Sequence, residues 1–215
     1  MTMPVNFINH IPIEAPIRMI LTRLGYRSAK TVLSRREREK LEKTIAESFY
    51  LCEPKGCWMR IPIVDKKYDE IVLPEGMILK SRSLAELLKN SSAIALMAST
   101  VGAAIVNAAS DAISCGDGST AVILDAVGGQ SADAAMNWIN EFLRRQVSRN
   151  DEQITIRRFS PGFGDFTIDN QKLFYSLLEL DSLGLTLTSR YMLVPEKSVT
   201  AVVGIEHSYS VKRQE

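Results

Sequence analysis

No βαβ repeat spans this sequence, although β-prone and helical segments both occur along it. A parallel sheet would need that repeat, because each crossover lays a helix on the sheet. The β-prone segments are instead grouped early and late in the chain, at residues 58–64, 70–73, 93–99, 154–158, 185–188 and 199–206. We therefore predict an α+β class, in which a mostly antiparallel β-sheet is flanked by helices.

Two capping boxes mark predicted helix starts. In this pattern a hydroxyl, and a carboxylate three residues later, satisfy backbone donors that the first helical turn leaves free. Ser34 with Glu37 precedes an apolar stripe of helical period, which predicts an amphipathic helix to about Leu51. Ser83 with Glu86 repeats the pattern and predicts a short second helix.

Longer helical stretches occupy the middle of the chain. Residues 101–113 are rich in alanine, which allows a helix to approach its neighbour closely. A long helix is predicted over 119–148, where Gly128 and Gly129 mark either a break or a close helix contact. We also predict an extended arm over 1–33 with a short helix near 18–24, and a capped helix over 169–180. No linker is visible, so a single domain is expected over 1–215.

Composition excludes several classes of protein. The 26 Lys and Arg nearly balance the 25 Asp and Glu, so the basic footprint of a nucleic-acid binder is missing. No apolar run reaches the roughly 18 to 20 residues that a membrane span needs, so we expect a cytoplasmic protein without membrane partners. Three cysteines fit reduced thiols better than disulfides. No metal site is expected, because Cys52 and Cys57 lack nearby histidines.

The segment 157–165, Arg-Arg-Phe-Ser-Pro-Gly-Phe-Gly-Asp, carries the chemistry that the sequence offers. An arginine presents a rigid fork suited to a carboxylate, and glycines let backbone groups reach a ligand. A neighbouring aromatic ring can cover a purine or a macrocycle. From spacing alone, a structural turn whose arginine pairs with a surface carboxylate is the simpler interpretation. The segment is neither a phosphate loop nor a dinucleotide fingerprint.

This loop resembles the Arg-Pro-x-Pro-Gly-Tyr signature of the reactivation (AdoMet-binding) domain of cobalamin-dependent methionine synthase. Other segments are similar to that family in order and spacing, at residues 99–102, 123–128, 183–188 and 195–199. The resemblance is strongest over 85–206. It implies the antiparallel fold of that domain, here as a free-standing protein.

The resemblance also implies a site for AdoMet (S-adenosyl-L-methionine). Arg158 matches the arginine that binds the AdoMet carboxylate, and the backbone groups of Ser160 and Gly162 match those that hold adenosine. Phe163 replaces the loop tyrosine and lacks its hydroxyl. Asn137 aligns with a glutamate that contacts the AdoMet amino group, so the charge is lost there. Tyr209 matches a late tyrosine of the family.

The function implied is reactivation, as an accessory part of a methyltransferase system in methionine biosynthesis. The chain would present the AdoMet methyl group for reductive methylation of cobalamin (vitamin B12) held by a partner, either a methionine synthase core or another corrinoid protein. Flavodoxin or another reductant would supply the electron. No catalytic residue is expected, because AdoMet and cobalamin carry the chemistry. Residues 191–197 are expected to help form the corrin-facing surface.

Two alternatives remain open on the sequence. Asn137 and Phe163 favour a non-catalytic subunit that docks on a corrinoid protein and no longer uses AdoMet. An independent small-molecule methyltransferase would need a glycine-rich nucleotide loop after an early strand and a candidate base, and neither is evident.

Overall fold

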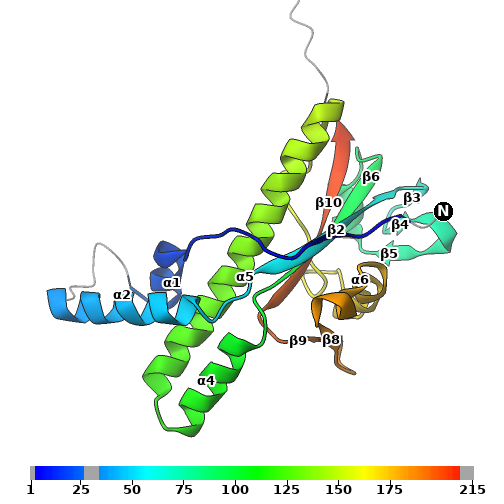
Figure 1. The fold of residues 1–215 in the computed structure, drawn as a ribbon. Helices are drawn as coiled ribbons and strands as arrows, with labels where there is room; N and C mark the ends of the chain where they lie inside the picture. Colours follow the sequence, from blue (N-terminus) through cyan, green and yellow to red (C-terminus); the bar gives the residue numbers. More distant parts are fainter. Residues whose placement is uncertain (1–2, 27–33, 209–215) are drawn as a thin grey trace, which may run out of the picture.

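A five-stranded antiparallel sheet forms the centre of the computed structural model, which describes residues 3–26 and 34–208 (Figure 1). In spatial order the strands are β1 (Asn6–Ile8), β2 (Lys55–Pro62), β6 (Ala93–Thr100), β10 (Ser198–His207) and β7 (Glu152–Ile154). Every neighbouring pair is antiparallel. The predicted α+β class with a mostly antiparallel sheet is confirmed.

Two smaller sheets accompany the main one. The first contains β3 (Asp65–Lys66), β4 (Glu70–Val72) and β5 (Ile78–Lys80), and the second contains β8 (Thr186–Leu187) and β9 (Leu193–Val194). Short 3₁₀ turns occur at η1 (Pro74–Gly76), η2 (Ser148–Asn150), η3 (Ile168–Asn170) and η4 (Leu180–Leu183).

The helices are α1 (Ile17–Arg23), α2 (Arg35–Phe49), α3 (Arg82–Leu87), α4 (Ala104–Ser114), α5 (Gly118–Val147) and α6 (Gln171–Leu177). In Figure 1 the long α5 runs across one face of the sheet, while α6 and the β3–β5 sheet lie on the other side. No described helix is long and apolar enough to cross a membrane.

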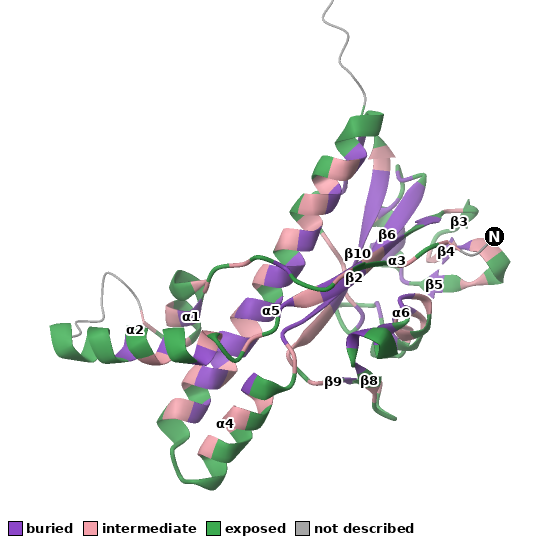
Figure 2. Ribbon diagram, in the orientation of Figure 1, coloured by how far each residue is buried: buried purple, intermediate pink, exposed green. Residues whose placement is uncertain are grey.

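Strand β6 shows why both faces of the sheet are covered. All eight of its residues are buried, and they appear purple in Figure 2. Because side chains alternate along a strand, Ala95 and Met97 pack against α5, whereas Ile94 and Leu96 pack on the side of α3 and α6. The molecule therefore has three layers, with the sheet in the middle.

A third apolar cluster joins the first half of α5 to the other helices. Ile20 of α1, Leu41 and Ile45 of α2 and Ile105 of α4 contact this half of α5. Gly128 lies inside the contact, since a Cβ atom there would stand 3.1 Å from Lys197 and 3.3 Å from Ile105. The helix continues through Gly128, which therefore marks a close contact and not a break.

One predicted capping box is confirmed and the other is wrong. The Ser34 hydroxyl accepts from the Glu37 backbone N–H, and Glu37 accepts from the Ser34 backbone, as predicted. Helix α3 instead begins at Ser81, whose hydroxyl accepts from the Leu84 N–H. Ser83 lies inside the helix, and Glu86 pairs with Lys89 at 2.7 Å.

Three further boundaries differ from the sequence predictions. The N-terminal arm is not only extended, because its residues 6–8 add the edge strand β1 beside β2. The strand predicted over 154–158 ends at Ile154, although the Thr155 N–H still donates to Gly204 of β10, and Phe159 pairs with β10 again through Val202. The helix predicted over 169–180 is shorter, because residues 168–170 form a 3₁₀ turn and the chain turns left-handed at Glu179. The predicted cap is also wrong, since the N-cap Asn170 makes no side-chain capping bond.

Candidate functional site

The loop that follows β7 is folded by its own hydrogen bonds. Phe159 exchanges two backbone bonds with Val202 of β10, at 2.9 and 2.8 Å. The Gly162 N–H then donates to the Phe166 carbonyl at 2.7 Å, and the Phe163 N–H donates to Ser160 at 3.2 Å. The far end is held by Asp165, which accepts from the Ser81 hydroxyl at 2.8 Å and from the Ser83 N–H at 3.1 Å.

Gly162 has a backbone angle φ of +92°, in the region that favours glycine. Its N–H is used within the loop, so the carbonyl oxygen is the backbone group that Gly162 could offer a ligand. A Cβ atom at this position would also stand 3.3 Å from Ile168. This glycine therefore fixes the turn beside Phe163.

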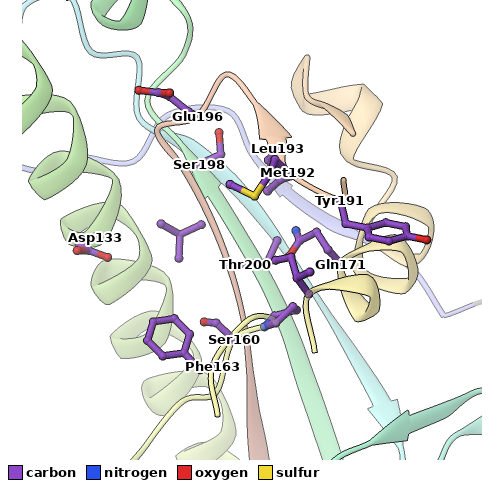
Figure 3. A pocket seen from close by; sticks show the side chains of 13 residues that line it. Asp133, Ser160, Phe163, Gln171, Tyr191, Met192, Leu193, Glu196, Ser198 and Thr200 are labelled. Carbon is purple, nitrogen blue, oxygen red and sulfur yellow. Dashed lines mark hydrogen bonds between the residues drawn. The ribbon is translucent and has the colours of Figure 1, made fainter. Parts of the chain in front are cut away.

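A pocket of about 300 Å³ opens beside this loop (Figure 3). It is bounded by the loop, by α5, by the start of α6, by the β8–β9 ribbon and by β10. Its lining residues are Asp133, Ser160, Pro161, Phe163, Ile168, Gln171, Tyr191, Met192, Leu193, Glu196, Ser198, Val199 and Thr200.

The lining combines apolar walls with two carboxylates. Phe163 and Met192 supply exposed apolar surface, at 67% and 57% exposure. Asp133 and Glu196 supply the charges, and none of the lining residues is basic. The pocket therefore suits a partly apolar ligand that carries positive charge.

The two carboxylates differ in their surroundings. Glu196 lies 3.0 Å from the Lys197 ammonium, which also reaches Asp125 of α5 at 2.5 Å. Burial would lower the pKa of Lys197, but the hydrogen bonds to Asp125 and Glu196 outweigh it and raise the pKa. Asp133 has no ion-pair partner among the described residues, so it can meet a cation without breaking an existing pair.

Arg158 and Asn137 lie beside the pocket and contact each other. The Arg158 guanidinium donates to the Asn137 Oδ1 atom at 2.5 Å. Asn137 follows Asp133 by four residues on α5, so both side chains project from one face of the helix. Arg158 also precedes the lining residue Ser160 by only two positions. The arginine is therefore placed at the α5 side of the pocket.

Gln171 occupies the inner wall. Its side chain is 4% exposed, and its Oε1 atom accepts from the Thr200 hydroxyl at 2.8 Å. The Nε2 atom is buried and has no hydrogen-bond partner among the described residues. Figure 3 shows Gln171 and Thr200 side by side within the group of lining side chains.

The fold of this chain resembles that of a solved structure. A structure described as the crystal structure of the MetH reactivation domain bound to AdoHcy matches this chain with a TM-score of 0.67, covering 96% of this chain and 79% of that chain. The chain has the fold of a methionine synthase reactivation domain. Sequence identity is 15%, so the likeness carries the fold alone. No protein-family profile and no curated protein matches the chain.

Within this reactivation-domain fold, the residues predicted from sequence fall into three groups. Ser160 and Phe163 line the pocket, Arg158 and Asn137 form a pair beside it, and Gly162 shapes the loop between them. Tyr209 lies outside the described residues. Whether these residues bind AdoMet stays a prediction.

Sequence reasoning did not single out three polar residues of the pocket, Asp133, Gln171 and Thr200, and it selected Glu196 only as part of the expected corrin-facing segment 191–197. The helical spacing from Asn137 back to Asp133 was a usable signal, because residues four apart share a face. Gln171 and Thr200 come from other elements and carry no comparable pattern. Across the described parts of the chain, no group of three His, Cys, Asp or Glu gathers in a way that could hold a metal ion.

Proposed function

We propose that this protein binds AdoMet in the pocket beside residues 158–164 and presents its methyl group for reductive methylation of cobalamin held by a partner. The observation that carries the proposal is this pocket, formed by the loop that resembles the family signature, in a fold whose solved neighbour was crystallised with AdoHcy.

The charges of the pocket fit the proposed ligand. AdoMet carries a sulfonium and an ammonium group, and the lining offers Asp133 and Glu196 with no basic residue. The apolar walls suit the adenosine portion, because a flat ring buries its faces well against Phe163 and Met192. Asp133 also supplies a carboxylate one turn before Asn137, where the family glutamate is missing.

Arg158 is the proposed partner of the AdoMet carboxylate. Its planar guanidinium can make two parallel hydrogen bonds to a carboxylate. This charged pair is stronger than the hydrogen bond to the neutral amide oxygen of Asn137. The guanidinium is oriented by its hydrogen bond to Asn137. On binding, the carboxylate would replace or share this contact.

The residues of this chain hold and orient the ligand. AdoMet would supply the methyl group to the reduced cobalt of the partner's cobalamin, and its sulfur would keep the electron pair of the broken C–S bond. Phe163, Met192 and Val194 are exposed around the pocket and its ribbon, so they can exclude water when a corrin covers them. No general acid or base is required of this chain.

The proposed partner is a cobalamin-binding methionine synthase core or another corrinoid protein, with flavodoxin or another reductant as electron source. With such a partner the chain would act in the cytoplasm and in methionine biosynthesis. Residues 191–197 are the proposed corrin-facing surface, because the β8–β9 ribbon forms the rim of the pocket.

Calorimetric titration with AdoMet tests the binding step. We expect micromolar affinity for the wild-type protein and a loss of about tenfold or more in Arg158→Ala, since a charge-assisted hydrogen bond contributes roughly 1.5 to 3 kcal/mol. Arg157→Ala removes the same charge one residue earlier and serves as the matched control. Equal affinity of both variants and the wild type would remove Arg158 from the site.

A second function, docking on a corrinoid protein without use of AdoMet, is favoured by the neutral Asn137 at the family's glutamate position. It predicts no heat up to millimolar AdoMet while the chain still associates with a cobalamin protein. One assay distinguishes the two functions. A methionine synthase core that holds cob(II)alamin and lacks its own reactivation domain is mixed with reductant and methyl-labelled AdoMet, with and without this chain. Reactivation transfers label to cobalamin only when this chain is present.

A further inference from the structure

Gln171 is a buried polar residue whose side chain is only half satisfied. It is the first residue of α6, it is 4% exposed, and it lies on the inner wall of the pocket. Buried donors in folded proteins nearly always have a partner, so a donor without one needs an explanation. Among the described residues, none accepts from the Gln171 Nε2 atom.

Thr200 contacts the oxygen of this amide. Thr200 lies on β10 and is 4% exposed, and its hydroxyl donates to the Gln171 Oε1 atom at 2.8 Å. Because Gln171 lines the pocket and its oxygen is used by Thr200, the nitrogen of the same amide is the group left to pair with a ligand there. The donor is therefore positioned before any ligand arrives, which lowers the entropy that binding would cost.

The surroundings of Gln171 indicate which part of a ligand lies against it. Pro161, Ile168, Leu193 and Val199 make much of the lining of this pocket apolar. The carboxylate of AdoMet is assigned to Arg158, which lies beside the pocket and not on its wall. The portion of the ligand that enters the pocket is then the nucleoside, whose base combines flat apolar faces with ring-nitrogen acceptors.

We propose that Gln171 recognises the adenine base, by donating a hydrogen bond from its Nε2 atom to one ring nitrogen. Thr200 acts as a positioning residue for this donor. The inference rests on the proposed AdoMet site and adds a base-specific contact to it. A base whose contacted ring nitrogen carries a hydrogen would bind more weakly, because that N–H group and the Gln171 Nε2 group are both donors.

Titration with adenosine and its 1-deaza, 3-deaza and 7-deaza analogues tests the contact without any change to the protein. Each analogue replaces one ring nitrogen by C–H. We expect one of the three to bind about tenfold more weakly than adenosine, the effect of a single lost buried hydrogen bond. Wild-type protein that binds all four nucleosides equally would overturn the proposal.

Two variants then assign the donor to Gln171. Gln171→Met removes the donor at similar volume, and we expect it to bind adenosine about tenfold more weakly and to lose the discrimination among the analogues. Gln171→Glu keeps an acceptor for the Thr200 hydroxyl but replaces the donor by a carboxylate, so it should bind adenosine at least as weakly. Gln153→Met, at an exposed position of β7, is the matched control and should behave as wild type.

The outcomes distinguish this inference from the function on which it rests. If AdoMet binds and depends on Arg158, but the discrimination persists in both Gln171 variants, the AdoMet site stands and the role of Gln171 falls. If the wild type binds neither AdoMet nor adenosine, both fall. Circular dichroism shows whether Gln171→Met is folded, and the wild-type analogue series stays decisive if it is not.

Discussion

Asp133 supplies a carboxylate without an ion-pair partner in the described structure, on the pocket wall formed by α5. AdoMet carries one more positive charge than AdoHcy, at its sulfur. We therefore expect Asp133→Asn to weaken AdoMet about fivefold, or roughly 1 kcal/mol, and to weaken AdoHcy less. Calorimetry with both ligands measures the ratio, with Asp111→Asn on α4 as the control. An equal loss for the two ligands would move the contact from the sulfonium to the shared ammonium.

Asp165 holds the end of the site loop against α3, and its environment makes this contact acid-resistant. The hydrogen bonds from Ser83 and Ser81 lower the pKa of this carboxyl to about 2, from an ordinary value of 3.8. A lowered folded-state pKa means that the stabilisation is complete above 3.8 and is lost as the pH falls toward 2.

The difference in the free energy of unfolding between wild type and Asp165→Asn should therefore be constant from pH 7 to about pH 4. It should shrink between 3.8 and 2, where the wild-type carboxylate is protonated. Denaturant titrations across this range measure it. A difference that already changes between pH 5 and pH 7 would mean that another group controls the loop.

Residues of the site could be predicted from sequence where they share one local segment. Ser160, Gly162 and Phe163 stand together in the loop, so a short pattern was enough to select them. Gln171 and Glu196 reach the same pocket from α6 and from the turn before β10, and only the tertiary fold joins them. A buried amide also leaves no trace in a sequence until its partners are known.

At the scale of elements, replacing either of two glycines by alanine is expected to change the stability of the protein in opposite directions. Gly129 lies inside α5, and a Cβ atom there meets nothing within 4 Å. Because glycine lowers helix stability relative to alanine, Gly129→Ala should stabilise the protein by about 0.5 to 1 kcal/mol. Gly56 lies in β2, where a Cβ atom would stand 2.3 Å from the Ala98 carbonyl oxygen and 2.6 Å from Ile139.

Gly56→Ala should therefore destabilise the protein by about 1 to 3 kcal/mol, the range for overpacked cores. Thermal and denaturant unfolding of the two variants measures both effects in the same experiment. A stabilising Gly56→Ala would mean that α5 does not approach β2 as closely as described.

Helix starts illustrate the limit of local patterns. The capping box at Ser34 is confirmed, because its two bonds involve only neighbouring residues. Around Ser83 the same pattern failed, because Asp165, 84 residues from Ser81, binds both the Ser81 hydroxyl and the Ser83 backbone. The edge strand β1 was missed since three residues are too few to show a period.

For the whole molecule, the cysteines report on unfolding of different regions. Burial raises the pKa of Cys57 to about 12 and that of Cys52 to about 11, whereas Cys115 is exposed between α4 and α5. Because the thiolate is the reactive form, a thiol reagent at pH 8 should label only Cys115 rapidly.

AdoMet should slow the labelling of Cys57, which reacts only after the core opens, and should leave Cys115 unchanged. Mass spectrometry of the labelled protein resolves the sites. Rapid modification of Cys57 in the native protein would contradict its burial, in which its thiol contacts the Leu178 carbonyl oxygen.

Helix α5 is about 45 Å long, at 1.5 Å for each of its 30 residues. Its first half packs against α1, α2 and α4, and its second half packs against the sheet. Asp133 lies where the two halves meet, and Asn137 follows one turn later. The helix is therefore held by packing along both halves, with the pocket residue Asp133 near its middle. A protein that bound the end of the molecule formed by α2 and α4 would contact the same helix that carries Asp133, and the length of that helix would set the distance from the bound protein to the pocket.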